Sequence, residues 1–121
     1  MKKIIYILML FSLSITPAIG SEWSKQDTYR ELAWTAILAL DYKQTLTIVN
    51  DPSKYEEYNP LLGKHPSQRK VEIYFASCAI IHPIISYYLP PQYRKWWQYI
   101  TIGVEAGAIG NSLRAGIGFA F

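Results

Sequence analysis

Apolar and polar residues follow one another in long blocks along this chain, and the blocks predict three helices at about residues 27–50, 71–89 and 91–113. Between the first two helices, residues 51–70 are rich in Asp, Asn, Pro and Gly, which favour turns. We expect this segment to be a solvated polar loop. The pattern therefore predicts an all-α fold, a small three-helix bundle without internal repeats.

The helices differ in how well they could cross a membrane. The stretch Ile73–Leu89 holds seventeen residues with no formal charge when His82 is neutral, and Trp96–Leu113 holds eighteen with one charge, Glu105. In the first helix, an apolar stretch of only nine residues precedes Asp41. An aspartate near the bilayer centre costs about 2.5 to 3.5 kcal/mol. The second helix is thus the best candidate for a membrane span, and the first is marginal.

The first twenty residues have the organisation of a signal peptide. Two lysines precede an apolar run of about ten to twelve residues, which is short for a spanning helix. Ala18 and Gly20 satisfy the small-residue pattern for cleavage before Ser21. We therefore expect a signal peptide over 1–20 and a single helical membrane domain over 21–121; an uncleaved N-terminal anchor is the alternative.

Composition places this chain between soluble and polytopic membrane proteins, since half of its 121 residues are hydrophobic and its mean hydropathy is +0.04. Without the two lysines of the signal peptide, the chain has ten basic and nine acidic residues, which gives a net charge of +1 with mixed signs. A nucleic-acid-binding protein would need a basic face, so we exclude nucleic acid as a partner. The single cysteine, Cys78, excludes an intramolecular disulfide and a multi-cysteine zinc site.

Aromatic and basic residues near the turn at Pro90-Pro91 are typical of a membrane–water interface. The aromatic residues around this turn are Tyr87, Tyr88, Tyr93, Trp96, Trp97 and Tyr99. The polar loop carries more basic residues than the turn does: Lys54, Lys64, Arg69 and Lys70 against Arg94 and Lys95. The positive-inside rule therefore puts the loop in the cytoplasm. We expect a protein of the bacterial inner membrane, in contact with the lipid bilayer, whose mature N-terminus is periplasmic.

Three ionisable residues interrupt the apolar stretches, one on each predicted helix: Asp41, His82 and Glu105. At the helical period, Gln44 shares a face with Asp41. We expect these faces to meet, which makes the four side chains a candidate polar cluster. Two carboxylates and one imidazole could bind a metal ion or relay protons. No metal motif of fixed spacing connects them, and we expect no cofactor. In the alternative interpretation, they satisfy one another's hydrogen bonds and hold the helices in register.

The most distinctive string of the loop runs from residue 55 to residue 66. It contains the candidate docking residues Glu57, Asn59, Pro60, Gly63 and His65. Asn59-Pro60 favours a turn, and Gly63 can supply a positive φ angle. The string is either a docking loop or lid over the helix ends, or a turn-rich connector, and the pattern leaves both interpretations open.

Small residues line one side of the third helix. Gly103, Gly107 and Gly110 lie opposite its polar face. Missing side chains let another helix approach closely. We expect a helix-packing face there, through which a homo-oligomer could form.

Several short strings connect these features across the chain. They are Asp41-x-x-Gln44-Thr45, Glu57-x-Asn59-Pro60-x-Leu62-Gly63-x-His65-Pro66, Tyr74-Phe75, His82, Leu89-Pro90, Tyr93-Arg94, Gln98-Tyr99 and Gly103-x-Glu105. In this pattern the chain resembles a group of small, uncharacterised membrane proteins of bacteriophages and of prophages in Gram-negative bacteria. The resemblance implies a phage or prophage origin and a place in the bacterial envelope. It implies no activity and no catalytic residue.

No complete catalytic motif is present, so the sequence favours a protein that is not an enzyme. We expect a small integral inner-membrane protein of phage or prophage type that acts by interaction, with another envelope or phage protein as its partner. One alternative is an intramembrane metal or proton site, or an enzyme, built on Asp41, His82 and Glu105. Another is a soluble periplasmic helical domain, which the modest mean hydropathy would allow.

Overall fold

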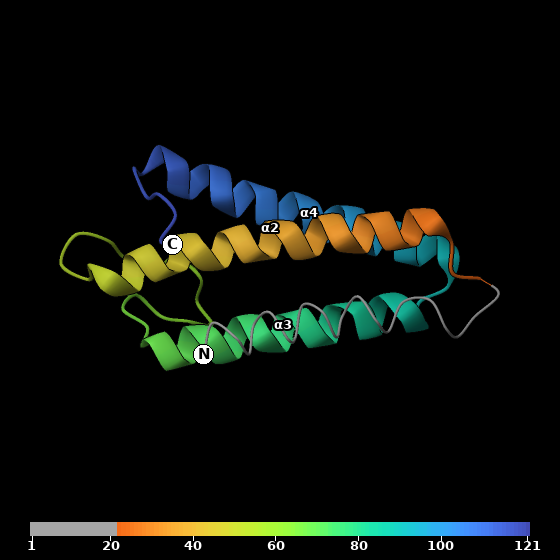
Figure 1. Ribbon diagram of the computed structural model, residues 1–121, viewed down its shortest axis with the longest axis horizontal. Coiled ribbons are helices and arrows are strands. Elements are labelled where there is room, and N and C mark those ends of the chain that lie inside the picture. Colours follow the sequence, from red (N-terminus) through yellow and green to blue (C-terminus); the bar gives the residue numbers. More distant parts are fainter. Residues whose placement is uncertain (1–21) are drawn as a thin grey trace.

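The computed structural model describes residues 22–121, and the predicted signal peptide over 1–20 lies outside the described residues. Three helices are described: α2 (Lys25–Asn50), α3 (Gln68–Tyr88) and α4 (Pro91–Arg114). Figure 1 shows α2 between the other two helices, antiparallel to α3 and running in the same direction as α4. The all-α prediction and the helical bundle are confirmed for this part of the chain. That the bundle lies in a membrane stays a prediction.

Helix α2 begins at Lys25, ahead of the expected start at 27, because Ser24 is its N-cap. The Ser24 hydroxyl accepts a hydrogen bond from the Asp27 backbone N–H (3.1 Å), and the Asp27 carboxylate accepts one from the Ser24 N–H (2.9 Å). This reciprocal capping box satisfies two of the amide donors that the start of a helix leaves free. Asp27 is therefore part of the first helical turn and not the N-cap.

Helix α3 begins at Gln68, because the hydroxyl of its N-cap, Ser67, accepts a hydrogen bond from a backbone N–H in the first turn (3.1 Å). Pro83 lies inside α3, and the helix continues past it to Tyr88. Pro91 is the first residue of α4, where its fixed φ angle and missing N–H suit the helix start.

The loop between α2 and α3 folds back onto the bundle. The Asn59 carbonyl accepts hydrogen bonds from the N–H groups of Leu62 (3.0 Å) and Gly63 (3.1 Å), and the Asn59 side chain accepts one from Leu61 (3.0 Å). Gly63 has a φ angle of 80°, in the region that favours glycine. Leu62 is buried in the apolar core beside Val71. The predicted turn is confirmed, and the loop also contributes to the core.

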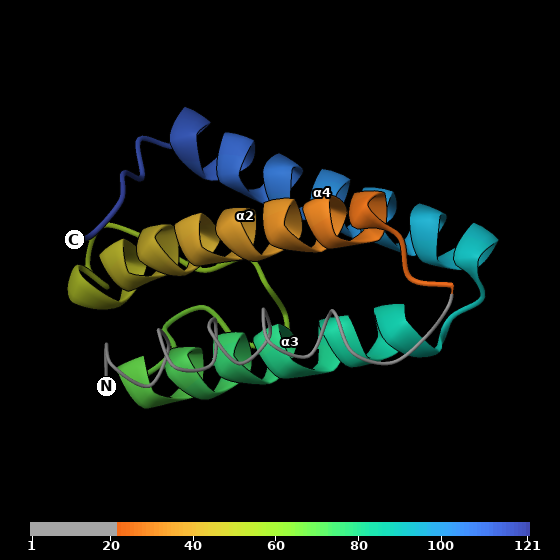
Figure 2. The same ribbon diagram turned by 45° about the vertical axis from the view of Figure 1, so that its right-hand side comes forward.

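The C-terminal tail, residues 115–121, turns back from α4 towards the end of α2 (Figure 2). The Ala120 N–H donates a hydrogen bond to the Lys43 carbonyl (3.0 Å), and the Thr47 hydroxyl donates one to the Gly118 carbonyl (2.8 Å). Ile117 is buried. The tail and the loop therefore close the same end of the bundle, which we call the loop end.

Polar side chains are buried inside this bundle, whereas many large apolar side chains lie outside. The apolar core is a cluster of Trp34, Leu38, Tyr42, Leu46, Leu62, Val71, Phe75 and Ala79. The buried polar and charged residues are Asp27, Glu31, Thr35, Gln44, Thr45, Glu72, His82, Ser86, Arg94 and Gln98. By length and mean hydropathy, one described helix, α3, could cross a membrane. Burial in water-soluble proteins mostly follows the opposite rule, with charged groups outside.

Candidate functional site

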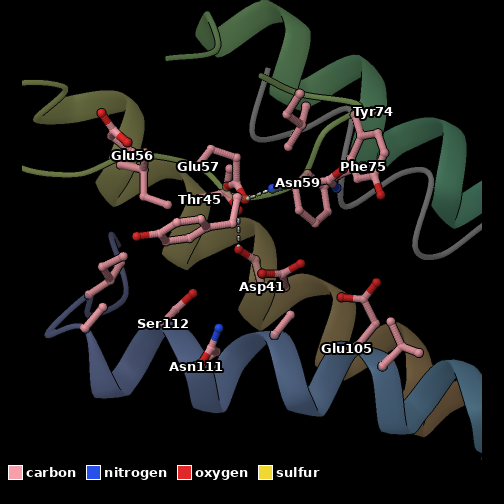
Figure 3. A pocket seen from close by; sticks show the side chains of 17 residues that line it. Asp41, Thr45, Glu56, Glu57, Asn59, Tyr74, Phe75, Glu105, Asn111 and Ser112 are labelled. Carbon is pink, nitrogen blue, oxygen red and sulfur yellow. Dashed lines mark hydrogen bonds between the residues drawn. The ribbon is translucent and has the colours of Figure 1, made fainter. Parts of the chain in front are cut away.

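A cavity of about 380 Å³ lies at the loop end, between α2, α4 and the loop. Figure 3 shows side chains from these three segments and from α3 around it. Its polar lining consists of Asp41, Thr45, Glu56, Glu57, Tyr58, Asn59, Tyr74, Glu105, Asn111 and Ser112. Four of these side chains are carboxylic acids, and the described lining contains no Lys, Arg or His. We call this cavity the acidic cavity.

Local hydrogen bonds place the side chains of α2 and of the loop at the cavity. On α2, the Thr45 hydroxyl donates to the Asp41 carbonyl one turn earlier (3.0 Å). In the loop, the Glu57 carboxylate accepts a hydrogen bond from the Asn59 backbone N–H (2.9 Å). The Asn59 turn therefore holds the loop acid next to α2. Two strings that stood out in the sequence thus come together at one cavity.

The carboxyl groups of Asp41 and Glu105 point toward one another across the acidic cavity (Figure 3). The Oε2 atom of Glu105 is buried and has no hydrogen-bond partner within the described part of the chain. Two carboxylates that share a site repel each other, so a shared proton or a bound cation lowers the energy of the pair. The arrangement can therefore hold a proton or a positively charged group.

His82 does not join this pair, so the expected cluster of Asp41, His82 and Glu105 does not form. The His82 Nδ1 atom lies 2.5 Å from Glu31 Oε1, and Nε2 lies 2.7 Å from Thr101 Oγ1. Both ring nitrogens are thus occupied. No three His, Cys, Asp or Glu side chains between residues 22 and 121 are grouped so as to hold a metal ion. Within these residues, Asp41, His82 and Glu105 therefore form no common metal site.

A second polar network lies at the opposite end of the bundle, near the turn between α3 and α4, and we call it the turn-end network. Its centre is Glu31, which is 2% exposed. Besides His82, the Glu31 carboxylate accepts hydrogen bonds from the Ser86 hydroxyl (2.8 Å) and from the Gln98 side chain (2.9 Å). These residues come from all three helices. The network therefore fixes the helices against one another, and Glu31 is the residue that the sequence reasoning missed.

Arg94 completes the turn-end network. Its guanidinium donates to the Asp27 carboxylate (3.0 Å) and to the backbone carbonyls of Ser86 (2.7 Å), Tyr87 (3.2 Å) and Leu89 (3.1 Å). The last carbonyls of a helix have no partners inside the helix. Arg94 thus donates hydrogen bonds to the last carbonyl groups of α3 and balances the charge of the buried Asp27 carboxylate on α2.

Gln44 was expected in the polar cluster with Asp41, but in the structure its side chain contacts other residues. It is 1% exposed, and its side-chain amide donates to the backbone carbonyls of Ile109 (3.3 Å) and Ile117 (3.2 Å). It is not among the residues that line the acidic cavity. Gln44 therefore connects α2 with α4 and with the C-terminal tail.

The candidate docking residues of the loop separate into two groups. Glu57 and Asn59 line the acidic cavity, as described above. Pro60 and Gly63 are exposed parts of the turn, and the His65 Nε2 atom lies 3.9 Å from an exposed Glu56 carboxylate. The connector interpretation fits the second group, whereas the first group belongs to the candidate site.

The glycine face of α4 is open in this structure. Gly103 and Gly107 are exposed, and a Cβ atom added at either of them or at Gly110 would meet no described atom within 4 Å. Neither α2 nor α3 uses this face. Its role in packing against another chain stays a prediction.

No protein-family model, curated protein or solved structure matches this chain. The resemblance to phage and prophage membrane proteins therefore stays a prediction from the sequence.

Proposed function

We propose that this chain is a small integral protein of the bacterial inner membrane, of phage or prophage type, that acts by interaction with another envelope or phage protein. The observation that supports this most is the distribution of side chains, with polar groups inside and apolar groups outside. A bilayer reverses the usual rule for the surface, because lipid tails are as apolar as leucine.

The outer face of α3 illustrates this distribution. Ile73 and Ile81 are 57% and 53% exposed, and Ile80, Ile84 and Ile85 also have large exposed fractions. Complete burial of an isoleucine side chain is worth about 1.5 to 3 kcal/mol in water, so each of these partly exposed side chains forgoes roughly half of that free energy. In lipid the same face carries no such penalty. The row of isoleucines thus favours a bilayer as its surroundings.

Helix α4 shows the same division between an inner polar and an outer apolar side, whereas α2 buries polar and apolar side chains together. On α4, Arg94 and Gln98 are buried, whereas Trp96, Ile100 and Val104 are exposed. Mean hydropathy averages over both sides of a helix, so it undervalues a helix whose polar residues are all buried against its neighbours. The shortest helix, α3, has 21 residues and is about 32 Å long at 1.5 Å per residue, enough for a hydrocarbon core of about 30 Å.

The charges support an orientation with the loop end in the cytoplasm. The basic residues of the loop are exposed: Lys54, Lys64, Arg69 and Lys70. At the other end, the buried Asp27 pairs with Arg94, which leaves Lys95 in the turn and Lys25 at the start of α2 as exposed cations. The positive-inside rule therefore favours a periplasmic location for the start of α2.

Alkaline carbonate extraction tests the proposal. Membranes from cells that express the full chain are washed at high pH, and the protein is then measured in the pellet and in the supernatant. A spanning protein stays in the pellet, together with a known integral protein as control. Release into the supernatant with peripheral and periplasmic controls would refute the proposal and favour the soluble periplasmic domain.

A second candidate function is a proton-handling or cation-handling site at the acidic cavity. The facing carboxyl groups of Asp41 and Glu105 favour it, since neither has a basic neighbour in the described lining. The test compares Asp41→Asn with Glu22→Gln, a change at an exposed acid of the opposite end. If the effect of the protein on its host cell is lost in Asp41→Asn but kept in Glu22→Gln, at equal protein level, the result supports the site. Equal phenotypes would refute it.

A further inference from the structure

A second cavity, of about 390 Å³, lies between α3 and α4 and reaches α2 at Trp34. Most of its lining is apolar and includes Ile81, Ile85 and Val104, which also face outward from the bundle. His82 and Thr101 are the polar pair in this lining that belongs to the turn-end network. We call this cavity the α3–α4 cleft. It is a mostly apolar cleft whose wall also carries the His82 imidazole, the Thr101 and Ser77 hydroxyl groups, the Tyr74 phenol, the Cys78 thiol and the Glu105 carboxyl group.

Glu31, His82 and Thr101 form a carboxylate–imidazole–hydroxyl series. The Glu31 Oε1 atom is 2.5 Å from His82 Nδ1, and His82 Nε2 is 2.7 Å from Thr101 Oγ1. An ionised carboxylate only accepts hydrogen bonds, so a neutral His82 carries its hydrogen on Nδ1 and leaves Nε2 free to accept the Thr101 proton. An acid that orients a base, and a base that contacts a hydroxyl group, are the parts of an activated nucleophile.

Aromatic packing fixes the imidazole in this series. The His82 ring stacks on Trp34 with a centroid distance of 3.6 Å and an interplanar angle of 9°, and it also stacks against Trp97 with a centroid distance of 4.9 Å and an angle of 25°. His82 is 4% exposed. A base that is held on both ring nitrogens and stacked on an indole cannot rotate away from the hydroxyl group, which is the preorganisation that general-base chemistry needs.

We propose that Thr101 is a nucleophile that cleaves carboxylic esters of long-chain lipids, with His82 as its base and Glu31 as the positioning residue of that base. The proposal goes beyond interaction in the envelope and rests on the membrane location proposed above, because the apolar rim of the α3–α4 cleft would then open to lipid chains. The hydrocarbon chain of the ester lies in the cleft, and its carbonyl carbon lies at Thr101.

The reaction balances with water as the second substrate. The Thr101 oxygen attacks the carbonyl carbon while His82 Nε2 takes the hydroxyl proton. The ester C–O bond breaks, and the alcohol leaves with that proton. Water then attacks the threonyl ester, gives a proton to His82, and releases the fatty acid as Thr101 regains its hydrogen. The sum is one ester and one water converted into one acid and one alcohol.

Two neighbouring hydroxyl groups are less suited to this role. Ser86 also donates to Glu31, but it is 0% exposed and does not line the cleft. The Thr101 hydroxyl also lies within hydrogen-bond distance of the Trp97 carbonyl (2.8 Å) and the Gln98 carbonyl (3.0 Å), which compete with His82 for its hydrogen. Ser77 lines the cleft, but its hydroxyl donates to the Ile73 carbonyl (2.7 Å). Thr101 is therefore the hydroxyl that combines a base with access to the cleft.

The test uses the full chain from carbonate-resistant membranes, purified in mild detergent, and an alkyl fluorophosphonate with a long chain as the probe. Intact mass and peptide mapping then locate the adduct. We expect one adduct on Thr101, absent in Thr101→Val and slowed about 10²-fold or more in His82→Gln. Ser77→Ala is the matched control, because Ser77 lines the cleft and its hydroxyl donates to the Ile73 carbonyl of its own helix (2.7 Å). It should label at the wild-type rate.

The positioning role of Glu31 needs a separate measurement. We expect Glu31→Gln to lower the labelling rate and to move the pH profile of labelling, whereas a purely structural role would lower the yield of folded protein and leave the profile in place. Absence of an adduct on folded wild-type protein, or an adduct on another residue that persists in Thr101→Val, overturns the proposal. Neither result bears on the proposed membrane location, because the alkaline carbonate extraction tests that proposal separately.

Discussion

Replacing Arg94 tests how the turn-end network holds the bundle together. Arg94 is 3% exposed, and its guanidinium bonds to the Asp27 carboxylate and to three carbonyls at the end of α3. Arg94→Ala removes the cation and leaves these acceptors buried. Arg94→Lys keeps a charge near Asp27 but loses the planar fork that reaches several acceptors at once. The two variants therefore separate the charge from the geometry.

The expected loss of stability depends on which buried groups each Arg94 variant leaves without a partner. Removing one partner of a buried ion pair typically costs about 3 to 5 kcal/mol. Asp27 keeps its ion pair with Arg30 in Arg94→Ala, so we expect the lower end of that range, about 3 kcal/mol. For Arg94→Lys we expect about 1 to 2 kcal/mol, the cost of leaving a buried carbonyl unsatisfied.

Thermal unfolding of the purified protein in mild detergent is the assay, and Lys95→Ala is the matched control. Lys95 is the next residue and is exposed, so its loss should change stability by less than about 0.5 kcal/mol. For a domain of this size, a loss of about 3 kcal/mol lowers Tm by more than about 10 °C. Equal Tm values for Arg94→Ala and Lys95→Ala would show that the buried ion pair does not stabilise the bundle.

Three further predictions concern the loop, the orientation of the bundle and the acidic cavity. Gly63→Ala should cost about 1 kcal/mol or more in unfolding measurements, because Gly63 has a φ of 80° that alanine adopts with strain; an unchanged Tm would contradict this. In whole cells that carry Cys78→Ser, an impermeant thiol reagent should label Gln92→Cys and not Ser53→Cys; the reverse pattern would show the opposite orientation. Glu105→Gln should melt higher than the wild type, because an amide can donate a hydrogen bond to the facing carboxylate; a lower Tm would reveal a stabilising partner of Glu105.

The helices could be predicted because three apolar blocks are separated by dense turn formers. Their starts could not be predicted as well, because capping depends on one hydroxyl group. Both Ser24 and Asp27 are good cap residues, and the choice between them is made by the reciprocal hydrogen bonds of the capping box. The place of Leu62 in the core was also missed, since a single leucine in a polar loop has no periodic pattern to reveal it.

The helical period indicated which sides of the helices carry Asp41, His82 and Glu105, but it could not tell which of these residues meet. The period tells which residues share a side of one helix, and says nothing of the level at which two helices meet. The distance of each residue from the turn end shows which residues lie at the same height in the bundle. Glu31 is six residues after the start of α2, and His82 is six residues before the end of α3. Asp41 lies ten residues beyond Glu31, about 15 Å away along α2. His82 therefore meets Glu31 and not Asp41.

The two ends of the bundle differ in how their charges are balanced, and this difference suggests a division of roles. At the turn end, acids and bases pair with one another and satisfy backbone carbonyls as well. At the loop end, Asp41 and Glu105 face each other without a basic neighbour in the described lining. Carboxyl groups that lower stability persist where function requires them. Neutralising the acidic cavity should thus raise stability and remove function, whereas neutralising the turn-end network should lower stability first.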